Sequence, residues 1–178
     1  MPNVRPPGSV ARPLRAIRLG VPAGLVAGAL SGAPSTLHAL LTHGDPVEAT
    51  VAAGTLLLPD ERRRGRLIAA AIPVHFGLSV GWGVVLAAVL PRRNAVAWGG
   101  LAGLAVAALD LGLVGRRYPR IRALPVLPQV LDHVAFGALA GVVLNARPGP
   151  TGGPWPGRLP GYARRAWRKA GGAGSARS

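Results

Sequence analysis

The sequence predicts an all-α integral membrane protein, a bundle of four transmembrane helices. Hydrophobic residues make up 49% of the 178 residues and charged residues only 15%, whereas soluble domains are about a quarter charged. Apolar stretches of roughly 20 residues, the length that crosses the hydrocarbon core of a bilayer, recur four times. Most of the arginines lie between these stretches, where membrane proteins place their cations.

The predicted spans cover residues 17–41, 67–90, 95–114 and 125–145. Pro34 interrupts the first span, and we expect a kink there because proline cannot donate a backbone hydrogen bond inside a helix. The charged run Asp60–Arg66, the turn Pro91–Asn94 and the basic loop Gly115–Arg122 separate or border the later spans.

Three further segments complete the organisation. Residues 47–58 are apolar but too short to span, so they predict a short extra helix between the first and second spans. If this segment did cross the membrane, the protein would have five spans, which is the alternative topology. Residues 1–16 form a basic N-terminal segment that precedes the transmembrane helical domain, 17–146. Residues 147–178 are rich in Pro, Gly and Arg and predict a disordered basic tail.

An internal repeat favours four spans over five. A shift of 58 residues aligns the second span with the fourth, matching His75 with His133, Ser79 with Gly137 and Gly83 with Gly141. A shift of 79 residues aligns the first span with the third, matching Gly20 with Gly99 and Gly24 with Gly103. Two halves of two helices each are implied. An insertion that crossed the membrane would reverse the first span relative to the third, which a parallel duplication forbids.

Four spans place both chain ends and the Arg92–Arg93 turn on one side. That side carries thirteen Arg and Lys residues and no acid, whereas the other side carries eight Arg and the acidic residues. The positive-inside rule therefore predicts cytoplasmic N- and C-termini. The abundance of Arg, Ala, Gly and Pro is typical of a high-GC bacterial genome, which suggests the bacterial plasma membrane as the location.

Few ionisable side chains lie inside the predicted spans, and each costs roughly 3 kcal/mol or more to insert. Four of them fall in the same half of the membrane and are expected to converge: His75, Asp110, Asp132 and His133. Four more approach from the same side as additional members of the cluster: His38, His43, Asp45 and Glu48.

The cluster has three interpretations. In the first, the histidines donate hydrogen bonds that tie helices together at about 1 kcal/mol each, and the protein is a structural or accessory bundle without catalytic activity. In the second, the cluster is a proton or cation pathway in a transporter or channel component. In the third, it belongs to a metal-binding protein or membrane enzyme. The sequence favours the first, because it contains no compact ligand motif, catalytic triad or phosphate loop; no cofactor is expected.

Small residues at helical spacing predict close packing between helices. They are Gly24, Gly28, Ser79, Gly83, Gly103, Gly137 and Gly141. Packing within one chain is the preferred interpretation and a homo-oligomer is the alternative. The lipid bilayer is the expected partner, with anionic lipid headgroups as candidate ligands of the tail residues Arg164, Arg165, Arg168 and Lys169. Nucleic acid is not an expected partner despite the net charge of +15.

Four sequence motifs carry a resemblance to known proteins. They read AGLVAG, DPVEATVAAGTLLLP, VHFGLSVGWGVVL and DHVAFGALAGVVL, in chain order. With them, residues 17–146 resemble small bacterial four-helix integral membrane proteins of unknown function. In that group a histidine followed by spaced glycines recurs in the second and fourth helices, which matches His75 and His133 here. The resemblance implies an inner-membrane location and supplies no activity.

Overall fold

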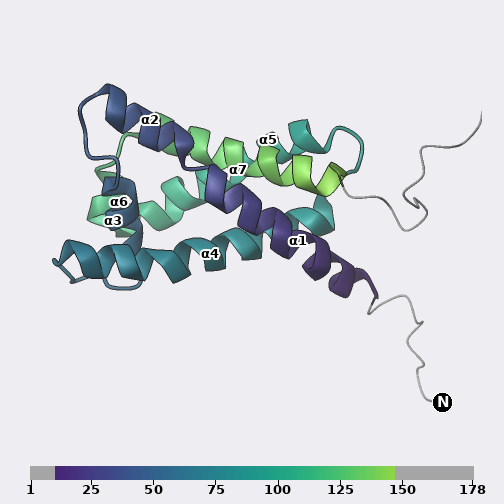
Figure 1. Ribbon diagram of the computed structural model, residues 1–178, viewed down its shortest axis with the longest axis horizontal. Helices are drawn as coiled ribbons and strands as arrows, with labels where there is room; N and C mark the ends of the chain where they lie inside the picture. Colours follow the sequence, from purple (N-terminus) through teal and green to yellow (C-terminus); the bar gives the residue numbers. More distant parts are fainter. Residues whose placement is uncertain (1–10, 147–178) are drawn as a thin grey trace, which may run out of the picture. The chain divides into compact units, whose positions relative to one another are not determined.

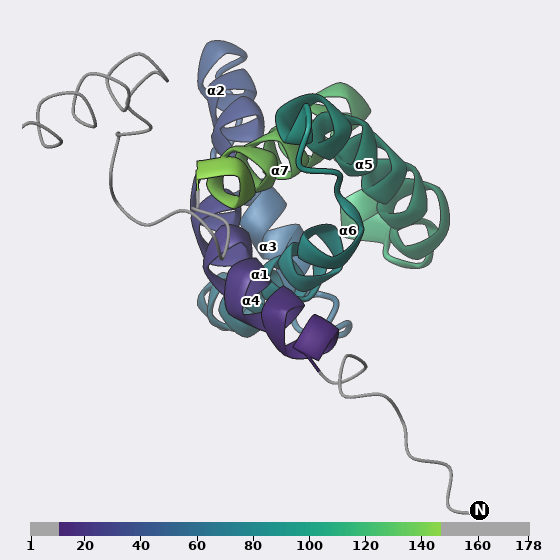
Figure 2. The ribbon, with the colours of Figure 1, turned by 90° about the vertical axis from the view of Figure 1, so that its right-hand side faces the viewer.

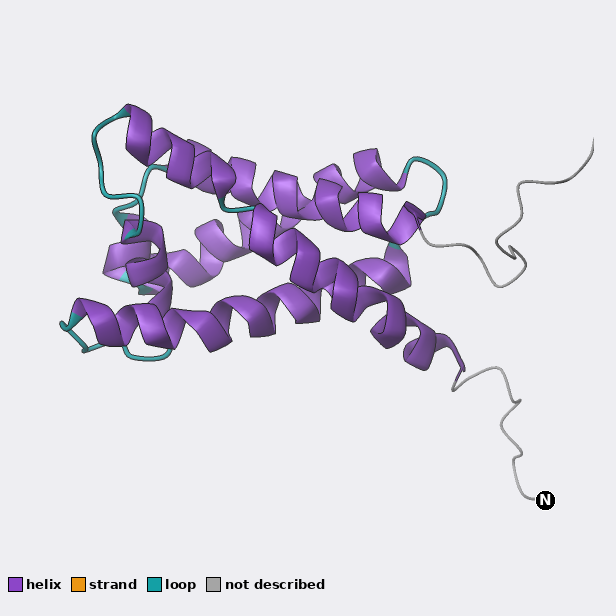
Figure 3. Cartoon of the chain, viewed as in Figure 1, coloured by secondary structure: helices purple, strands orange, loops and turns teal. Residues whose placement is uncertain are grey.

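The computed structural model describes residues 11–146, all within the first of the two units into which the chain divides, Met1–Arg147. Over this range the chain is built of helices joined by short loops (Figure 3), as the sequence predicts. The predictions for residues 1–10 and for the basic tail lie outside the described residues.

Four helices are long and apolar enough to cross a membrane, so the four-helix prediction is confirmed at that level. Their ranges are Arg12–Leu41, Arg64–Val89, Ala95–Arg117 and Val126–Ala146. The first contains α1 (Ala11–Leu30) and α2 (Ala33–Leu41), the second is α4, the third contains α5 (Ala95–Leu109) with a π-helix, η1 (Asp110–Val114), and a 3-10 turn, η2 (Gly115–Arg117), and the fourth is α7. Two short helices, α3 (Glu48–Gly54) and α6 (Pro119–Arg122), lie between them.

The long helices form two antiparallel hairpins. Helix α1 packs against α4, α5 packs against α7, and the hairpins meet mainly along α1 and α7. Figure 1 shows α1 beginning and α7 ending at the same end of this bundle, with α2, α3 and α6 at the opposite end. Seen from the first end, the helices are arranged around a central region (Figure 2). The described chain ends therefore share one end with the α4–α5 turn, as the four-span topology predicts.

Glycines hold each hairpin together by allowing the backbones to touch. A Cβ atom on Gly24 would lie 2.2 Å from the carbonyl oxygen of Ser79, and one on Gly103 would lie 2.1 Å from that of His133. Both distances are too short for any side chain. The predicted packing residues are therefore interface residues within the chain, in keeping with small-residue packing in membrane bundles.

The two hairpins share a contact pattern in a different register from the one that matching letters suggested. The contacts of Gly24 with Ser79 correspond to those of Gly103 with His133, and the contacts of Gly20 with Gly83 correspond to those of Gly99 with Gly137. The offset between α4 and α7, from Ser79 to His133 and from Gly83 to Gly137, is 54 residues. The predicted alignment of His75 with His133 is thus wrong by four residues, about one helical turn.

The first span breaks at a different position from the one predicted. Helix α1 ends at Leu30, Ser31 and Gly32 form a turn, and Pro34 lies in the first turn of α2. A proline ring clashes with the carbonyl group four residues earlier, here that of Leu30, but is tolerated in a first turn, where no intrahelical donor is required. The helix therefore ends before Pro34 instead of bending at it.

The insertion between the first two spans forms α3, as predicted. Its seven residues rise about 10 Å, too little to cross a core of about 30 Å, so α3 is not a fifth span. It packs on the beginning of α4, where Val51 and Leu67 are 1% and 0% exposed and Gly54 touches the α4 backbone. The helix thus closes one end of the bundle beside α4.

Large apolar side chains cover the outside of the bundle. More than 40% of the side chain is exposed at Leu25, Val26, Ile72, Leu78, Val85, Leu101 and Leu104. Soluble monomers rarely expose an apolar surface of this extent, whereas a lipid environment favours it. The interior is small by comparison, with Ala27, Leu86, Phe136 and Ala140 forming the buried core cluster where α1, α4 and α7 meet.

Candidate functional site

Four ionisable residues line one cavity of about 240 Å³ between the two hairpins, as the sequence predicts. His75 comes from α4, Asp110 from the start of η1, and Asp132 and His133 from α7. The remaining lining is largely apolar and includes the aromatic rings of Trp82 and Phe136. A space of this size has room for several water molecules, so the polar groups need not be dry.

His133 and Asp110 form the only side-chain pair of opposite charge between the long helices of the described segment. Nε2 of His133 lies 3.1 Å from Oδ2 of Asp110, and Nδ1 lies 2.7 Å from the backbone oxygen of Gln129. A carbonyl oxygen can only accept, so Nδ1 carries a proton that it donates to Gln129. Contact between Nε2 and the carboxylate then requires a second proton, bound either to the imidazole or to the carboxyl group.

The local backbone at Asp110 departs from an ordinary α-helix. From Asp110 to Val114 the hydrogen bonds follow the π pattern, and the Gly115 N–H donates to the carbonyl of Asp110. Single π-turns are rare and occur often at functional sites. This feature carried no signal in the apolar sequence around Asp110.

His75 and Asp132 bind backbone groups of the first span. Nε2 of His75 donates to the carbonyl of Gly28 at 2.9 Å, across α4 and α1. Asp132 accepts from the backbone N–H of Ser35 at 3.0 Å and from the Ser35 hydroxyl. Ser35 lies in the first turn of α2, whose N–H groups have no partner inside the helix. The Asp132 carboxylate therefore caps α2 from another helix, a role that sequence reasoning did not assign to Ser35.

The additional residues predicted for the cluster lie elsewhere. His38, Asp45 and Glu48 line a neighbouring pocket of about 240 Å³ that opens beside α2 and α3. His43 lines neither pocket; it is exposed in the loop after α2 with a positive φ of 55°. The prediction that these four residues approach the cluster is corrected, because the loop between α2 and α3 holds them beyond the helix ends.

The two pockets are adjacent. Both are lined by Ala49, Leu124 and Gln129. The hydrogen bond from Ser35 to Asp132 joins them as well, because Ser35 lines the outer pocket and Asp132 the inner one. The polar cavity and the outer pocket are therefore separated by a few shared side chains.

Ion pairs fasten the insertion over this end of the bundle. Arg64 of α4 pairs with Asp45 and lies 4.0 Å from Glu48, and Arg120 of α6 lies 3.9 Å from Glu48. The pKa of Asp45 is lowered, first by the hydrogen bond from the Val47 N–H and then by Arg64. The outer acids are therefore ionised partners of arginines.

Within residues 11–146, no three His, Asp or Glu side chains gather closely enough to hold a metal ion. The part of the chain that the structure describes also has no buried polar side-chain atom lacking a hydrogen bond. The predicted lipid-binding residues of the tail lie outside the described range.

The fold and the site define a helical bundle with four potential membrane spans and an ionisable cavity between two hairpins. The chain matches no protein-family model, no curated protein and no solved structure. The argument for function therefore depends on the geometry of the cavity.

Proposed function

We propose that the protein is a transporter or channel component that takes up and releases a proton in the cavity lined by His75, Asp110, Asp132 and His133. One observation carries the proposal: the ionisable side chains of α4, η1 and α7 line the same cavity in an otherwise apolar bundle. Inserting such groups into a membrane is costly, so their retention on one cavity favours a role in moving charge.

The His133–Asp110 pair supports a proton as the species that moves. Because Nδ1 of His133 donates to the Gln129 carbonyl, the pair holds one shared proton between Nε2 and Oδ2. Imidazole exchanges protons near neutral pH. Release of this proton would leave the Asp110 carboxylate facing a neutral ring, and uptake would restore the pair.

The adjacent pocket supports a route toward one membrane surface. Gln129 borders both spaces, and the outer pocket lies beside the loop that carries Asp45. Water in the two pockets would connect the pair to bulk solvent on that side, with α3 and its ion pairs narrowing the entrance.

Proton flux into liposomes tests the proposal. Purified protein is reconstituted, a membrane potential is imposed, and internal pH is followed with a dye. We expect His133→Asn and Asp110→Asn to reduce the flux to that of protein-free liposomes, because an amide still hydrogen-bonds but exchanges no proton. The matched controls are His43→Asn and Asp60→Asn, which make the same changes in exposed loops and should leave the flux intact. Equal flux in all five proteins would refute a proton pathway through the pair.

A structural or accessory bundle is the second candidate. Its specific support is that His75, Asp132 and His133 each hydrogen-bond a group on another helix of the bundle. Buried polar links in membrane bundles contribute about 0.6 kcal/mol each, and at most about 1.7 kcal/mol. A double-mutant cycle on His133 and Asp110, measured by unfolding in detergent, gives their coupling. Coupling of this size with no proton flux in the wild type would establish the structural role instead.

We further propose that the protein resides in the bacterial plasma membrane with both termini cytoplasmic. The cationic bias of the end that carries Arg12 and Arg92 supports this orientation. The chain contains no cysteine, so single substitutions report the side directly. An impermeant maleimide should label Thr42→Cys in intact cells and Asn145→Cys only after the membrane is opened. The reverse pattern would invert the topology.

A further inference from the structure

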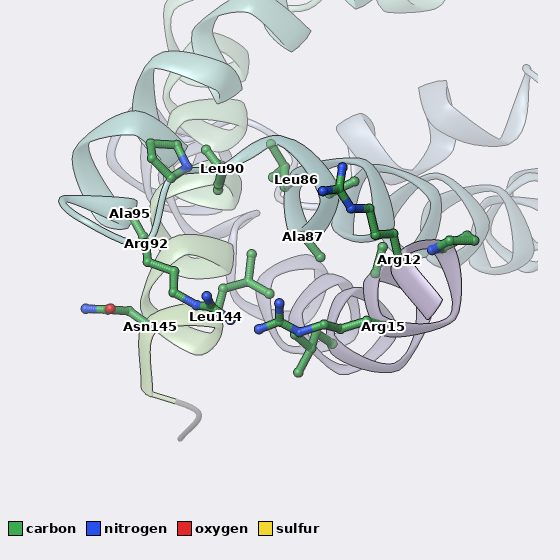
Figure 4. A pocket seen from close by; sticks show the side chains of 14 residues that line it. Arg12, Arg15, Leu86, Ala87, Leu90, Arg92, Ala95, Leu144 and Asn145 are labelled. Carbon is green, nitrogen blue, oxygen red and sulfur yellow. The ribbon is translucent and has the colours of Figure 1, made fainter. Parts of the chain in front are cut away.

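A second cavity, of about 470 Å³, lies at the end of the bundle opposite α3. Figure 4 shows three arginine side chains around it: Arg12 and Arg15 from the first turns of α1, and Arg92 from the turn between α4 and α5. No Asp or Glu is among the described residues that line it. The cavity is therefore strongly cationic and has no described carboxylate to balance it.

The floor and walls of this cavity are apolar. Leu86 of α4 is 2% exposed beneath it, and Leu19, Leu90 and Leu144 contribute from α1, the α4 end and α7. Asn145, beside Leu144, adds an amide at the rim. The lining thus combines three guanidinium groups with an aliphatic surface.

The cavity lies where all four candidate spans have an end. The first begins at Arg12, the second ends at Val89, the third begins at Ala95 and the fourth ends at Ala146. In a membrane this level is the boundary between the hydrocarbon core and the headgroups. A ligand in the cavity would have its charged part among the arginines and its apolar part along the helices.

We propose that this cavity binds the headgroup phosphate of an anionic phospholipid. Guanidinium forks match phosphate oxygens in pairs, and basic pockets between helix ends on the cytoplasmic side favour acidic lipid headgroups. Free phosphate shares the charge but has no use for the leucines that line the cavity. A lipid satisfies both parts of the lining at the depth where the arginines lie. This site is distinct from the tail arginines and from the proton cavity.

Binding of a fluorescent phosphatidylglycerol to the purified full-length protein in neutral detergent micelles tests this site. Unlabelled phosphatidylglycerol should displace the probe, whereas phosphatidylcholine and inorganic phosphate should not. Each cation near a lipid surface contributes about 1 kcal/mol, so the triple variant Arg12→Gln, Arg15→Gln and Arg92→Gln should weaken binding roughly a hundredfold. If that triple does not fold, Arg92→Gln alone should weaken it about fivefold.

A matched triple at the other end of the bundle controls for net charge: Arg62→Gln, Arg116→Gln and Arg117→Gln, all exposed. It should bind the probe as the wild type does. Equal losses in both triples would reduce the effect to overall charge and overturn the site, as would displacement by phosphatidylcholine. Displacement by inorganic phosphate would assign the cavity to a free anion instead.

The inference depends on the membrane location proposed above, which an independent experiment checks. Alkaline carbonate should leave the protein in the membrane fraction. Release by carbonate would refute the membrane location itself, whereas retention with no preference for phosphatidylglycerol would refute only the lipid site.

Discussion

The contact between α5 and α7 offers a sharp test of the fold, through the substitution Gly137→Ala. The added Cβ would lie 1.9 Å from the carbonyl oxygen of Gly99, whereas real Cβ contacts essentially never fall below 3.0 Å. The two backbones must therefore separate by at least about 1.1 Å. A gap of 0.5–1 Å already forfeits about a quarter to a half of the dispersion energy of a contact. Overpacking of this kind costs about 1–3 kcal/mol.

The matched control is Gly81→Ala in α4, where an added Cβ meets nothing within 4 Å. Alanine is the better helix former by about 1 kcal/mol, so this variant should be as stable as the wild type or slightly more stable. Reversible unfolding in mixed micelles, followed by circular dichroism, measures both. If Gly137→Ala proves as stable as Gly81→Ala, α5 and α7 do not touch through glycine, and the register derived from these contacts is wrong.

Two further predictions concern polar contacts at the α3 end of the bundle. Ser35→Ala removes the hydroxyl donor to Asp132 and should lower the free energy of unfolding by about 1–2 kcal/mol, whereas Thr36→Ala, whose hydroxyl bonds only within its own helix turn, should change it far less; equal losses in the same unfolding assay would contradict the cap. The pKa of Asp45 is lowered in the folded protein from 3.8, so its contact with Arg64 stabilises the fold above that pH and stops doing so as the pH falls through the lowered pKa. Stability measured against pH should therefore lose part of its acid dependence in Asp45→Asn, and curves of identical shape would show that the ion pair contributes nothing.

The positions of the long helices were predictable because the signal is local. Each apolar run is bounded by charged or proline-rich segments, so length and composition alone locate the spans to within a few residues. The same reasoning identified 47–58 as too short to cross, and α3 is a single short helix.

The break in the first span and the repeat register were less accessible. Pro34 marks the break, but whether the helix bends at the proline or ends before it depends on the clash with Leu30 and on the free turn at Ser31 and Gly32. The register was assigned by matching histidines, although the contacts that fix it are made by glycines and backbone atoms. Identical letters therefore gave an alignment one turn away from equivalent positions.

The membership of the polar cluster was predictable only for groups on the spans. His75, Asp110, Asp132 and His133 lie at similar depth on helices of fixed rise, so their convergence follows from topology. The loop residues depend on how the insertion packs. Partners such as Ser35 and the carbonyl of Gln129 could not be found, because they carry no distinctive sequence signal.

The corrected register explains why the cavity lies beside His133 and has no twin in the first hairpin. Ser79 and His133 occupy equivalent places, each with its backbone against a glycine of the partner helix. Serine is the smaller side chain, so the first hairpin leaves room where the second carries an imidazole, and Ser79 itself borders the cavity. His75 lies one turn away and donates to Gly28. Two similar hairpins therefore enclose an asymmetric space, with the proton-sharing pair on one wall and a small hydroxyl side chain on the other.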